Sequence, residues 1–423
     1  MPHPRLFACL TIAVIAFSLA FSAPPARAGS AAESASVPVD SRFFDYDSRA
    51  PLAATVTPLP DKDGLRVSRV TYPSPVVTPF PVNNRVVAYF FQPPGPGPHP
   101  AMVVLHEWLP NNLNDEFVMC EGMAHAGFAA LLVEEPYSMD RRPVPHRPDA
   151  ELLSGNLPQM VAGLREAVID ARRGADWLQS QPDIDPQRMG IAGISLGGVL
   201  APLTAGADSR LKVVLTVVGG ADVADLIWNS LTTRGIHKGL VQRGESYQSL
   251  VTGMAPFEAG RWLRHFNPEN ALLFNGRYDI IVRPWQAEDM AHALGGARIV
   301  WLNTGHYGGV FTESDVVAAG ARFLQSRFFT DVPAFHAPDT LPAQTIKLGF
   351  LVGGQELLSP ALAYQALNFD RAGRLSFDAQ ITLHGLSGAV SARLNDFQEV
   401  GIEFPVFHGT TRPRPFLLFH VVL

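Results

Sequence analysis

A serine between two glycines is the part of this sequence best suited to chemistry. In "GIAGISLGGVLAPL" (Gly190–Leu203), Ser195 stands between Gly193 and Gly197, behind one apolar run and ahead of another. We interpret the runs as a strand and a helix joined by a tight turn, where side chains at the glycines would meet neighbouring backbone. The bend exposes the serine Oγ, and the unpaired N–H of Leu196 at the helix start favours a negative oxygen beside it. The pattern predicts a nucleophilic serine; the alternative is a glycine-rich turn with an inert one.

A serine hydroxyl becomes a strong nucleophile only when a base, held by a carboxylate, takes its proton. Asp279 follows the strand-like run in "ALLFNGRYDIIV", and His306 follows the next such run in "ARIVWLNTGHYGGV". The chain order Ser, Asp, His, each just beyond a later strand, is typical of one catalytic topology. We predict His306 as the base and Asp279 as the acid. Asp279 could instead cap a turn, which would leave Glu288 or Asp315 as the acid.

The loop after the strand-like run "AMVVLHEW" is expected to supply a second backbone donor for the negative oxygen. The N–H of Trp108 is the first choice and that of Glu107 the second. His106 lies upstream of the serine, where this topology does not place its base, so we expect it to shape the loop. His106 and Glu107 are also candidate substrate-binding residues, and Glu107 could equally be an orienting hydrogen-bond acceptor or an exposed loop residue.

Three stretches together resemble the α/β-hydrolase superfamily: "DIDPQRMGIAGISLGG", "NGRYDIIV" and "NTGHYG". The resemblance covers about residues 65–328 and looks closest to dienelactone-hydrolase-like and prolyl-oligopeptidase-like serine hydrolases, including acetyl-xylan-esterase-type carboxylesterases. It implies that Ser195 is the nucleophile, Asp279 the acid and His306 the base of a carboxylesterase. The chain departs from dienelactone hydrolase in having serine rather than cysteine as nucleophile, and it lacks the H-G-G-G run of lipase-like esterases.

The elements around these residues alternate between apolar runs of strand length and helical patterns, from about residue 61 to 330. Continuous apolar strands alternating with helices predict an α/β fold, with a mostly parallel sheet covered by helices on both faces. The expected strands are 85–93, 101–108, 128–136, 188–194, 211–220, 271–276 and 297–303, and the expected helices 116–126, 164–178, 196–205, 284–294 and 314–323. We expect residues 61–330 to form the catalytic domain.

Residues 222–267 interrupt this alternation and are long enough to cap a cleft. Trp228, Tyr247 and Trp262 are therefore candidate substrate-binding residues, with packing in the core as the alternative for each.

After about residue 340 the sequence changes from continuous apolar runs and helical patterns to an alternation of apolar and polar residues. Leu375, Phe377, Ala379, Ile381 and Leu383 alternate with polar residues, which is the period of a half-buried antiparallel strand. Similar runs at 345–352, 388–395, 400–407 and 415–422 are its expected neighbours. We predict a small β-rich accessory module over residues 340–423, and this part of the chain matches no family that we can name.

The first residues have the pattern of a cleaved secretory signal: Arg5, an apolar stretch over residues 6–21, and Ala26-Arg27-Ala28. Because about 20 residues are needed to cross a bilayer, we expect residues 1–28 to be removed, and a retained anchor is the alternative. Residues 29–60, rich in Ala, Ser and Pro, are expected to be a flexible leader. The mature chain would be periplasmic or extracellular, without a membrane span. Cys9 would leave with the signal, and Cys120 is expected to be a buried thiol.

Composition and the absence of known motifs limit the partners and cofactors that we expect for this protein. A net charge of −6, without basic runs, gives no reason to expect a nucleic-acid partner. No cofactor or metal motif is visible, so hydrolysis should survive chelators.

The leading hypothesis is a serine esterase that acts on a small-molecule or acylated substrate, with oligomeric state left open. One alternative is a prolyl-oligopeptidase-like peptidase, although no propeller-like repeat precedes the domain. Another is a non-catalytic binding protein on a hydrolase scaffold.

Overall fold

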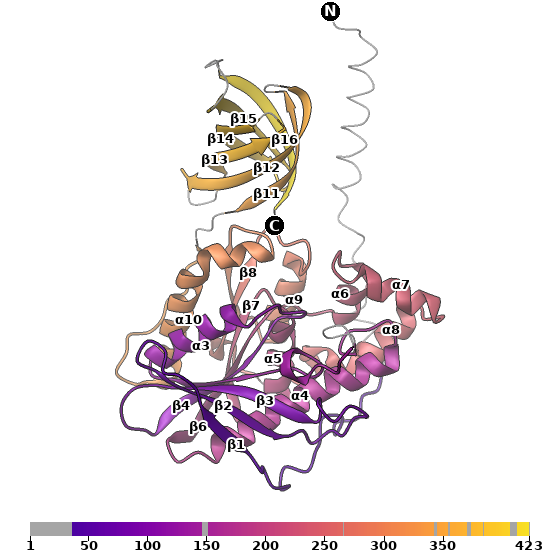
Figure 1. Ribbon diagram of the computed structural model, residues 1–423, viewed down its shortest axis with the longest axis vertical. Coiled ribbons are helices and arrows are strands. Elements are labelled where there is room, and N and C mark those ends of the chain that lie inside the picture. The colour runs from indigo at the N-terminus through magenta and orange to yellow at the C-terminus, as the bar shows by residue number, and fades with distance from the viewer. Residues whose placement is uncertain are drawn as a thin grey trace, which may run out of the picture.

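The computed structural model describes residues 36–145, 151–264, 266–341, 345–353, 356–369, 374–383, 385–406 and 413–422. The predicted signal at residues 1–28 lies outside the described residues. The described chain forms a ten-stranded sheet with helices, followed by a closed six-stranded barrel (Figure 1). The predicted fold class, an α/β domain with a C-terminal β-rich module, is thus confirmed.

The large sheet contains the strands β1 (Thr55–Pro58), β2 (Arg66–Pro73), β3 (Arg85–Gln92), β4 (His99–Leu105), β5 (Ala129–Val133), β6 (Ile184–Ile194), β7 (Leu211–Val217), β8 (Ala271–Gly276), β9 (Arg298–Leu302) and β10 (Thr340–Leu341). Its helices are α3 (Asn114–His125), α4 (Leu157–Gln179), α5 (Leu196–Ala207), α6 (Val223–Asn229), α7 (Arg234–Gln242), α8 (Tyr247–Met254), α9 (Pro284–Ala293) and α10 (Glu313–Phe328). Each strand and helix expected before residue 330 is present, with shifted ends. The sequence patterns missed β1, β2 and β10.

The order of the sheet is β1-β2-β3-β5-β4-β6-β7-β8-β9-β10. The pairs from β1 to β5 on the β1 edge are antiparallel, and every pair from β5 through β4 to β10 is parallel. The carboxyl ends of parallel strands meet at one edge, so the loops after β4, β6, β8 and β9 come together there. These four loops carry Ser195, Asp279, His306 and the candidate residues His106, Glu107 and Trp108.

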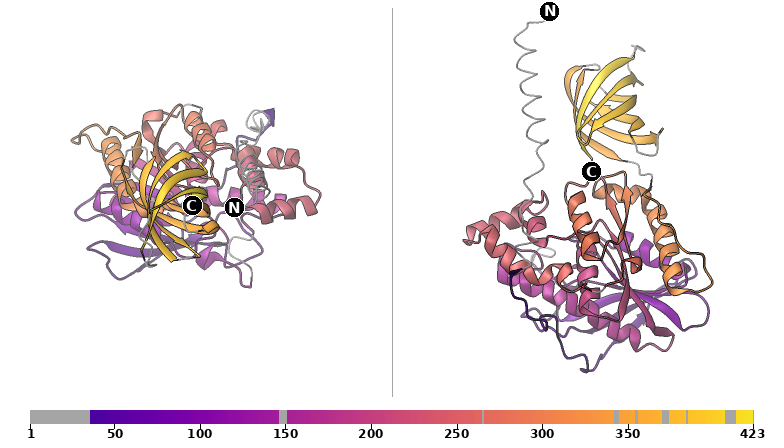
Figure 2. Two further views of the ribbon diagram at one scale, coloured as in Figure 1. Left: turned by 90° about the horizontal axis from the view of Figure 1, so that it is seen from above. Right: turned by 180° about the vertical axis from the view of Figure 1, so that it is seen from behind.

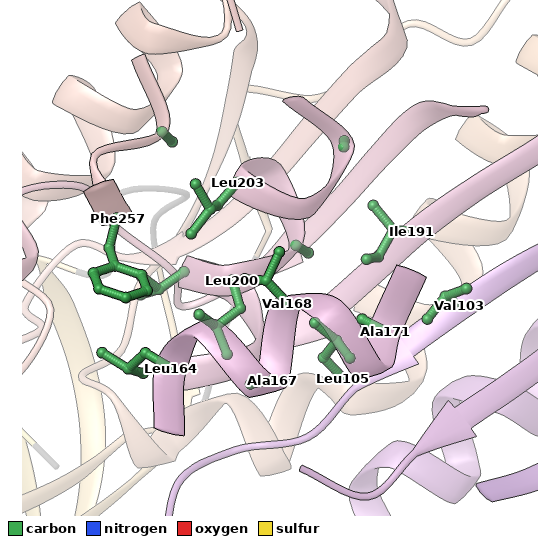
Figure 3. Close-up of a cluster of buried hydrophobic side chains, with 14 of the residues drawn as sticks. Val103, Leu105, Leu164, Ala167, Val168, Ala171, Ile191, Leu200, Leu203 and Phe257 are labelled. Carbon is green, nitrogen blue, oxygen red and sulfur yellow. The ribbon is translucent and has the colours of Figure 1, made fainter. Parts of the chain in front are cut away.

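Helices cover both faces of the sheet (Figures 1 and 2). The helices α4, α5 and α9 pack in one apolar core, and α3 and α10 pack in a second core on the other face. The predicted apolar stripe of α4 is buried along its whole length, and Leu164, Ala167, Val168 and Ala171 face the sheet and α5 in Figure 3. Cys120 on α3 is fully buried, as predicted, and burial raises the pKa of its thiol.

Residues 36–60, expected to be part of a flexible leader, instead pack against α4. The Phe44 side chain is 2% exposed and joins the core beside Phe257 and Trp262. Arg172 and Arg173 on α4 donate hydrogen bonds to backbone carbonyls of this segment, at Phe44, Ser48 and Ala50. The composition suggested mobility, but the Phe44 side chain, the half-buried Arg172 and the buried Arg173 fix residues 44–50 against α4.

The barrel consists of β11 (Ile346–Gly353), β12 (Glu356–Asn368), β13 (Leu375–Thr382), β14 (Gly385–Asn395), β15 (Gln398–Pro405) and β16 (Arg414–Val422). Consecutive strands pair antiparallel, and β11 closes the ring by pairing with β16. The β-rich module was predicted, but the longest strand, β12, was not.

Within the described residues, no helix is both long enough and apolar enough to cross a membrane.

Candidate active site

Ser195 occupies a sharp turn between β6 and α5. Its backbone has a positive φ of 52° with a ψ of −110°, which is a strained conformation for a residue with a side chain. A Cβ on Gly193 would lie 2.2 Å from the backbone of Gly197, and one on Gly197 would lie 2.3 Å from the carbonyl oxygen of Leu105. Both glycines are therefore required for the turn to close, which is the reason that the sequence analysis gave for them.

Ser195, His306 and Asp279 form a continuous hydrogen-bonded chain. The Ser195 Oγ lies 2.9 Å from His306 Nε2, and His306 Nδ1 lies 2.7 Å from Asp279 Oδ2. The other oxygen of Asp279 accepts hydrogen bonds from the backbone N–H groups of Ile281 and Val282, which fix the carboxylate. Asp279 thus caps a turn and holds the imidazole at the same time. Glu288 and Asp315, the alternative acids, are exposed on α9 and α10.

The surroundings of His306 favour the protonated ring. Burial by itself lowers the pKa of His306, but the charge of Asp279, its hydrogen bond and the charge of Glu107 outweigh burial and raise the pKa above its usual 6.5. A base with this environment takes a proton readily and stabilises the imidazolium that results. The geometry allows the ring to accept the Ser195 proton through Nε2 while Nδ1 remains bonded to Asp279.

His106 lies in the interior of the protein rather than in a substrate cleft. Its ring is fully buried, Nδ1 lies 2.6 Å from the carbonyl oxygen of Glu107, and Nε2 accepts the backbone N–H of Glu135. Burial lowers the pKa of His106 to about 4, so the ring is neutral. The carbonyl oxygen of His106 accepts the N–H of Gly197 and so ties the loop after β4 to the serine turn. The ring shapes this loop, as expected, and the substrate-binding role considered for it is not supported.

A buried cluster of ionic side chains contacts the segment that binds the His106 ring. Arg141 is fully buried and pairs with Asp170 at 2.7 Å and Glu166 at 3.2 Å, both on α4. It also donates to the carbonyl oxygen of Glu134, the residue before the one that binds His106. Burial and the neighbouring Asp170 carboxylate raise the pKa of Glu166 to about 8. Arg141 thus connects α4, through its ion pairs with Asp170 and Glu166, to the backbone at Glu134. The next residue, Glu135, binds His106 in the loop after β4.

Comparisons with known proteins match the sequence and the fold of parts of this chain. The sequence model of the prolyl oligopeptidase family matches residues 165–305, and that of the dienelactone hydrolase family matches residues 86–231. A solved acetyl xylan esterase from Paenibacillus sp. R4 is 23% identical with a TM-score of 0.52, and the match covers 68% of this chain and 93% of that one. The chain has the α/β-hydrolase fold.

Two further relatives match this α/β-hydrolase less extensively. Acetyl xylan esterase 1 from Thermoanaerobacterium sp. JW/SL YS485 is 14% identical with a TM-score of 0.47, and the match covers 66% of this chain and 91% of that one. YtaP of Bacillus subtilis (strain 168) is 36% identical over 55 residues, which are 13% of this chain and 18% of that protein. The hydrolase thus matches less than a fifth of the length of this curated relative.

An apolar cavity of about 80 Å³ lies next to Ser195 in the α/β-hydrolase. Its walls come from α4, α5, the loop after β4, the turn after Asp279 and the inserted segment 222–267. The lining residues are Trp108, Leu153, Leu164, Leu196, Val199, Leu200, Val223, Leu226, Ile227, Ser230, Thr232, Thr233, Phe257, Ile281 and Val282. The segment predicted to cap a cleft therefore does contribute to this one.

Trp228, Tyr247 and Trp262 are not among the described residues that line this cavity. Trp228 stacks on His237 at 4.1 Å and contacts the Tyr247 ring edge-on, and Trp262 packs on Phe44 and donates its Nε1–H to the carbonyl oxygen of Pro256. These three aromatic residues pack the inserted segment, which is the alternative considered for them.

A second cavity, of about 210 Å³, lies on the other side of His306. Glu107, Asp115 and Glu313 line it together with Tyr307, which is 54% exposed. Glu107 thus faces a cavity beside the base, as one of the two expectations for it allowed. Burial raises the pKa of Glu107, and the charge of Asp115 raises it further.

Sequence reasoning found the residues of the hydrogen-bonded chain but missed most of the cavity wall. Leu153, Val223, Leu226 and Ile227 are ordinary apolar residues whose spacing fits helix packing as well as ligand contact. No sequence signal separates the two roles, because the difference lies only in whether a neighbouring side chain or an open space faces them.

Proposed function

We propose that this hydrolase is an exported serine carboxylesterase that cleaves esters of short acyl groups. The observation that carries the proposal is the chain of contacts from Ser195 Oγ through His306 to Asp279, at 2.9 and 2.7 Å, beside a small apolar cavity. Export is proposed on the signal-like pattern over residues 1–28.

In the proposed reaction, His306 Nε2 takes the proton of Ser195 while the serine oxygen forms a bond to the ester carbonyl carbon. The carbonyl oxygen becomes negative, and the imidazolium then gives its proton to the departing alcohol as the C–O bond breaks. Water repeats the sequence on the acyl-enzyme: His306 takes a proton from water, and the acid leaves as Ser195 regains its own. Asp279 holds the ring throughout and stabilises its positive charge.

The N–H groups of Leu196 and Trp108 are the proposed donors to the negative oxygen. Two neighbouring N–H groups already donate hydrogen bonds to other acceptors. The Glu107 N–H donates to Glu116 Oε1 at 3.0 Å, and the Gly197 N–H donates to the carbonyl oxygen of His106 at 3.0 Å. Trp108 and Leu196 both line the cavity with Ser195. Because the Glu107 N–H already has an acceptor, Glu107 is disfavoured as the donor to the negative oxygen, for which the sequence made it the second choice.

The cavity supports a short acyl group in the proposed substrate. Its volume of about 80 Å³ and its apolar walls suit a small hydrocarbon group attached to the carbonyl carbon. The cavity beside His306 lies where the alcohol would leave, and its acidic residues disfavour a negatively charged alcohol.

A peptidase is the second candidate function, favoured by the match of residues 165–305 to the prolyl oligopeptidase family. The same residues would attack an amide, and the His306 imidazolium would then give its proton to the leaving amine instead of an alcohol. Comparing kcat/KM for an ester and an anilide that carry the same acetyl group separates the two functions, and a faster anilide would favour the peptidase.

Replacing the nucleophile tests the proposal directly. Ser195→Ala is expected to lower kcat for p-nitrophenyl acetate by at least about 10³-fold and to abolish labelling by a fluorophosphonate probe. Ser326→Ala, a serine on α10 away from the site, is the matched control and should keep both. Full hydrolysis by the folded Ser195→Ala protein would exclude the mechanism, and a folded parent chain that takes no label would favour a non-catalytic binding protein.

A further inference from the structure

The barrel buries many polar side chains and exposes many large apolar ones, beside a small buried apolar cluster. On β13, Ser376, Asp378 and Gln380 are at most 2% exposed, whereas Leu375 and Ile381 on the same strand are 42% and 53% exposed. Strands β11, β12, β14 and β15 also expose large apolar residues, whereas β16 exposes none and buries Phe416, Leu418, Phe419 and Val422. The exposed large apolar residues of the barrel are Leu348, Phe350, Leu358, Leu362, Leu367, Phe369, Leu375, Ile381, Leu383, Leu386, Val390, Leu394, Val400, Ile402, Phe404 and Val406.

These side chains form a continuous surface because they pair across neighbouring strands. Leu362 on β12 pairs with Ile381 on β13, which in turn pairs with Leu386 on β14. Val390 on β14 pairs with Ile402 on β15 in the same way. Soluble monomers rarely expose a contiguous apolar surface of this extent, and such surfaces mark a binding face.

The interior of the barrel pairs several of its buried charged side chains with one another. Lys347 is fully buried and contacts Asp378 and Glu399, each at 2.8 Å, and Glu399 also pairs with Arg393 at 3.3 Å. Burial alone would raise the pKa of Glu399, but His420, Lys347 and Arg393 lower it to about 2. The buried charges therefore compensate one another, and the narrow interior of a six-stranded barrel is filled by side chains.

Two properties of the backbone suit this barrel to a surrounding of hydrocarbon. The pairing of β11 with β16 closes the ring, so the sheet has no edge with unpaired N–H and C=O groups, which hydrocarbon cannot satisfy. The strands contain from 8 to 13 residues, which brackets the roughly 9–11 residues of a tilted strand that crosses a bilayer.

The polar end of the barrel faces the α/β domain. The Arg393 guanidinium lies 3.9 Å from the centre of the Tyr278 ring, which follows β8 beside Asp279. A polar cleft lies between the two parts of the chain and is lined by Arg277, Tyr278, Asn303, Asp339, Arg374, Arg393, Asn395 and Asp396 among others. Charged residues at one end and an apolar belt around the strands are what an interface between water and lipid requires.

We propose that the outer face of strands β11–β15 of the barrel is a lipid-binding surface, which inserts among the acyl chains of a bilayer and holds the α/β domain at its surface. The occupant of this surface is lipid hydrocarbon rather than a second protein. The proposal goes against the sequence-based expectation of a mature chain without a membrane span. It is independent of the proposed esterase chemistry, because it rests on the exposed apolar residues of the barrel and not on Ser195, His306 or Asp279.

The test is flotation of the full chain with phosphatidylcholine vesicles. Leu362→Arg/Ile381→Arg places two charges on paired, outward-facing positions, and each is unfavourable in hydrocarbon. We expect this variant to lose at least about tenfold in vesicle affinity. The control Val77→Arg/Val241→Arg adds the same charges at exposed apolar positions of the α/β domain and should bind as the parent does. Unchanged p-nitrophenyl acetate hydrolysis and circular dichroism would show that both variants are folded.

A label locates the surface within the bilayer. In a Cys9→Ser background, a fluorophore on Ile381→Cys is expected to be quenched by lipids with brominated acyl chains, and one on Val241→Cys is not; Cys120 is buried and will not compete. Vesicle binding that is equal in all variants would overturn the proposal and place the contact elsewhere, such as residues 6–21. A lipid-free dimer that Leu362→Arg/Ile381→Arg dissociates, without vesicle binding, would overturn it in favour of a second copy.

Discussion

The α/β domain and the barrel bury opposite kinds of side chain. Every residue of β5 is buried and apolar, and the faces of the large sheet meet two apolar cores. The barrel instead encloses Lys347, Asp378 and Glu399 together with a small apolar cluster, and exposes most of its large apolar residues. The α/β domain is organised for water outside, whereas the barrel is organised for a surrounding less polar than its own interior.

The difference also concerns what buried charges do in the two regions. The Arg141 cluster lies beneath the loop that carries Trp108 and contributes to the position of the site. The Lys347 cluster contacts only barrel residues among its described partners. Similar ionic groups therefore contact the segment beside the candidate site in one region and neighbouring strands in the other.

The largest expected effect comes from removing the central cation of each cluster. Arg141→Met and Lys347→Met should each lower the free energy of unfolding of their own region by about 3–5 kcal/mol, because two carboxyl groups lose their partner. Urea unfolding monitored by circular dichroism measures the loss. We expect kcat/KM to fall in folded Arg141→Met and to stay at the parent value in Lys347→Met. Equal effects of the two substitutions on kcat/KM would contradict the separation of the regions.

An intermediate effect is expected at the wall of the apolar cavity. Leu226→Ala enlarges the cavity beside Ser195, so kcat/KM for a hexanoyl ester should rise about tenfold relative to that for an acetyl ester. Leu231→Ala, at a 49% exposed leucine of the same inserted segment, is the matched control and should leave the ratio unchanged. Competition kinetics with paired p-nitrophenyl esters measure the ratio, and the same change in both variants would show that the cavity does not bind the acyl group.

The smallest expected effect is a shift in pH dependence. His306 acts as a base only when neutral, so kcat/KM should rise as pH increases through its pKa, which lies above the usual 6.5. Glu107→Gln removes a negative charge that stabilises the imidazolium, so the pKa falls and the acid limb moves to lower pH. Glu288→Gln, at an exposed site on α9, should leave the limb in place. A limb that stays fixed or moves upward in Glu107→Gln would show that this charge does not act on His306.

The sequence predicted five of the helices, most of the strands and the three residues of the hydrogen-bonded chain, but not the helices α6, α7 and α8 of the inserted segment. These follow from local rules: apolar periodicity, two glycines whose Cβ atoms would collide with backbone, and polar residues placed just after successive strands. The cavity wall and the packing roles of Trp228, Tyr247 and Trp262 did not follow, because an apolar residue has the same pattern whether it meets a neighbour or an open space.

The barrel shows most clearly what the sequence determines and what it does not. The alternation from Leu375 to Leu383 determines that one face of β13 differs from the other. Only the closure of six strands decided that the polar face turns inward, because that closure brings Lys347, Asp378 and Glu399 from three separate strands within 2.8 Å contacts. A charge far apart in the sequence from its partners gives no local sign of them, and pairing of this kind is what makes its burial stable.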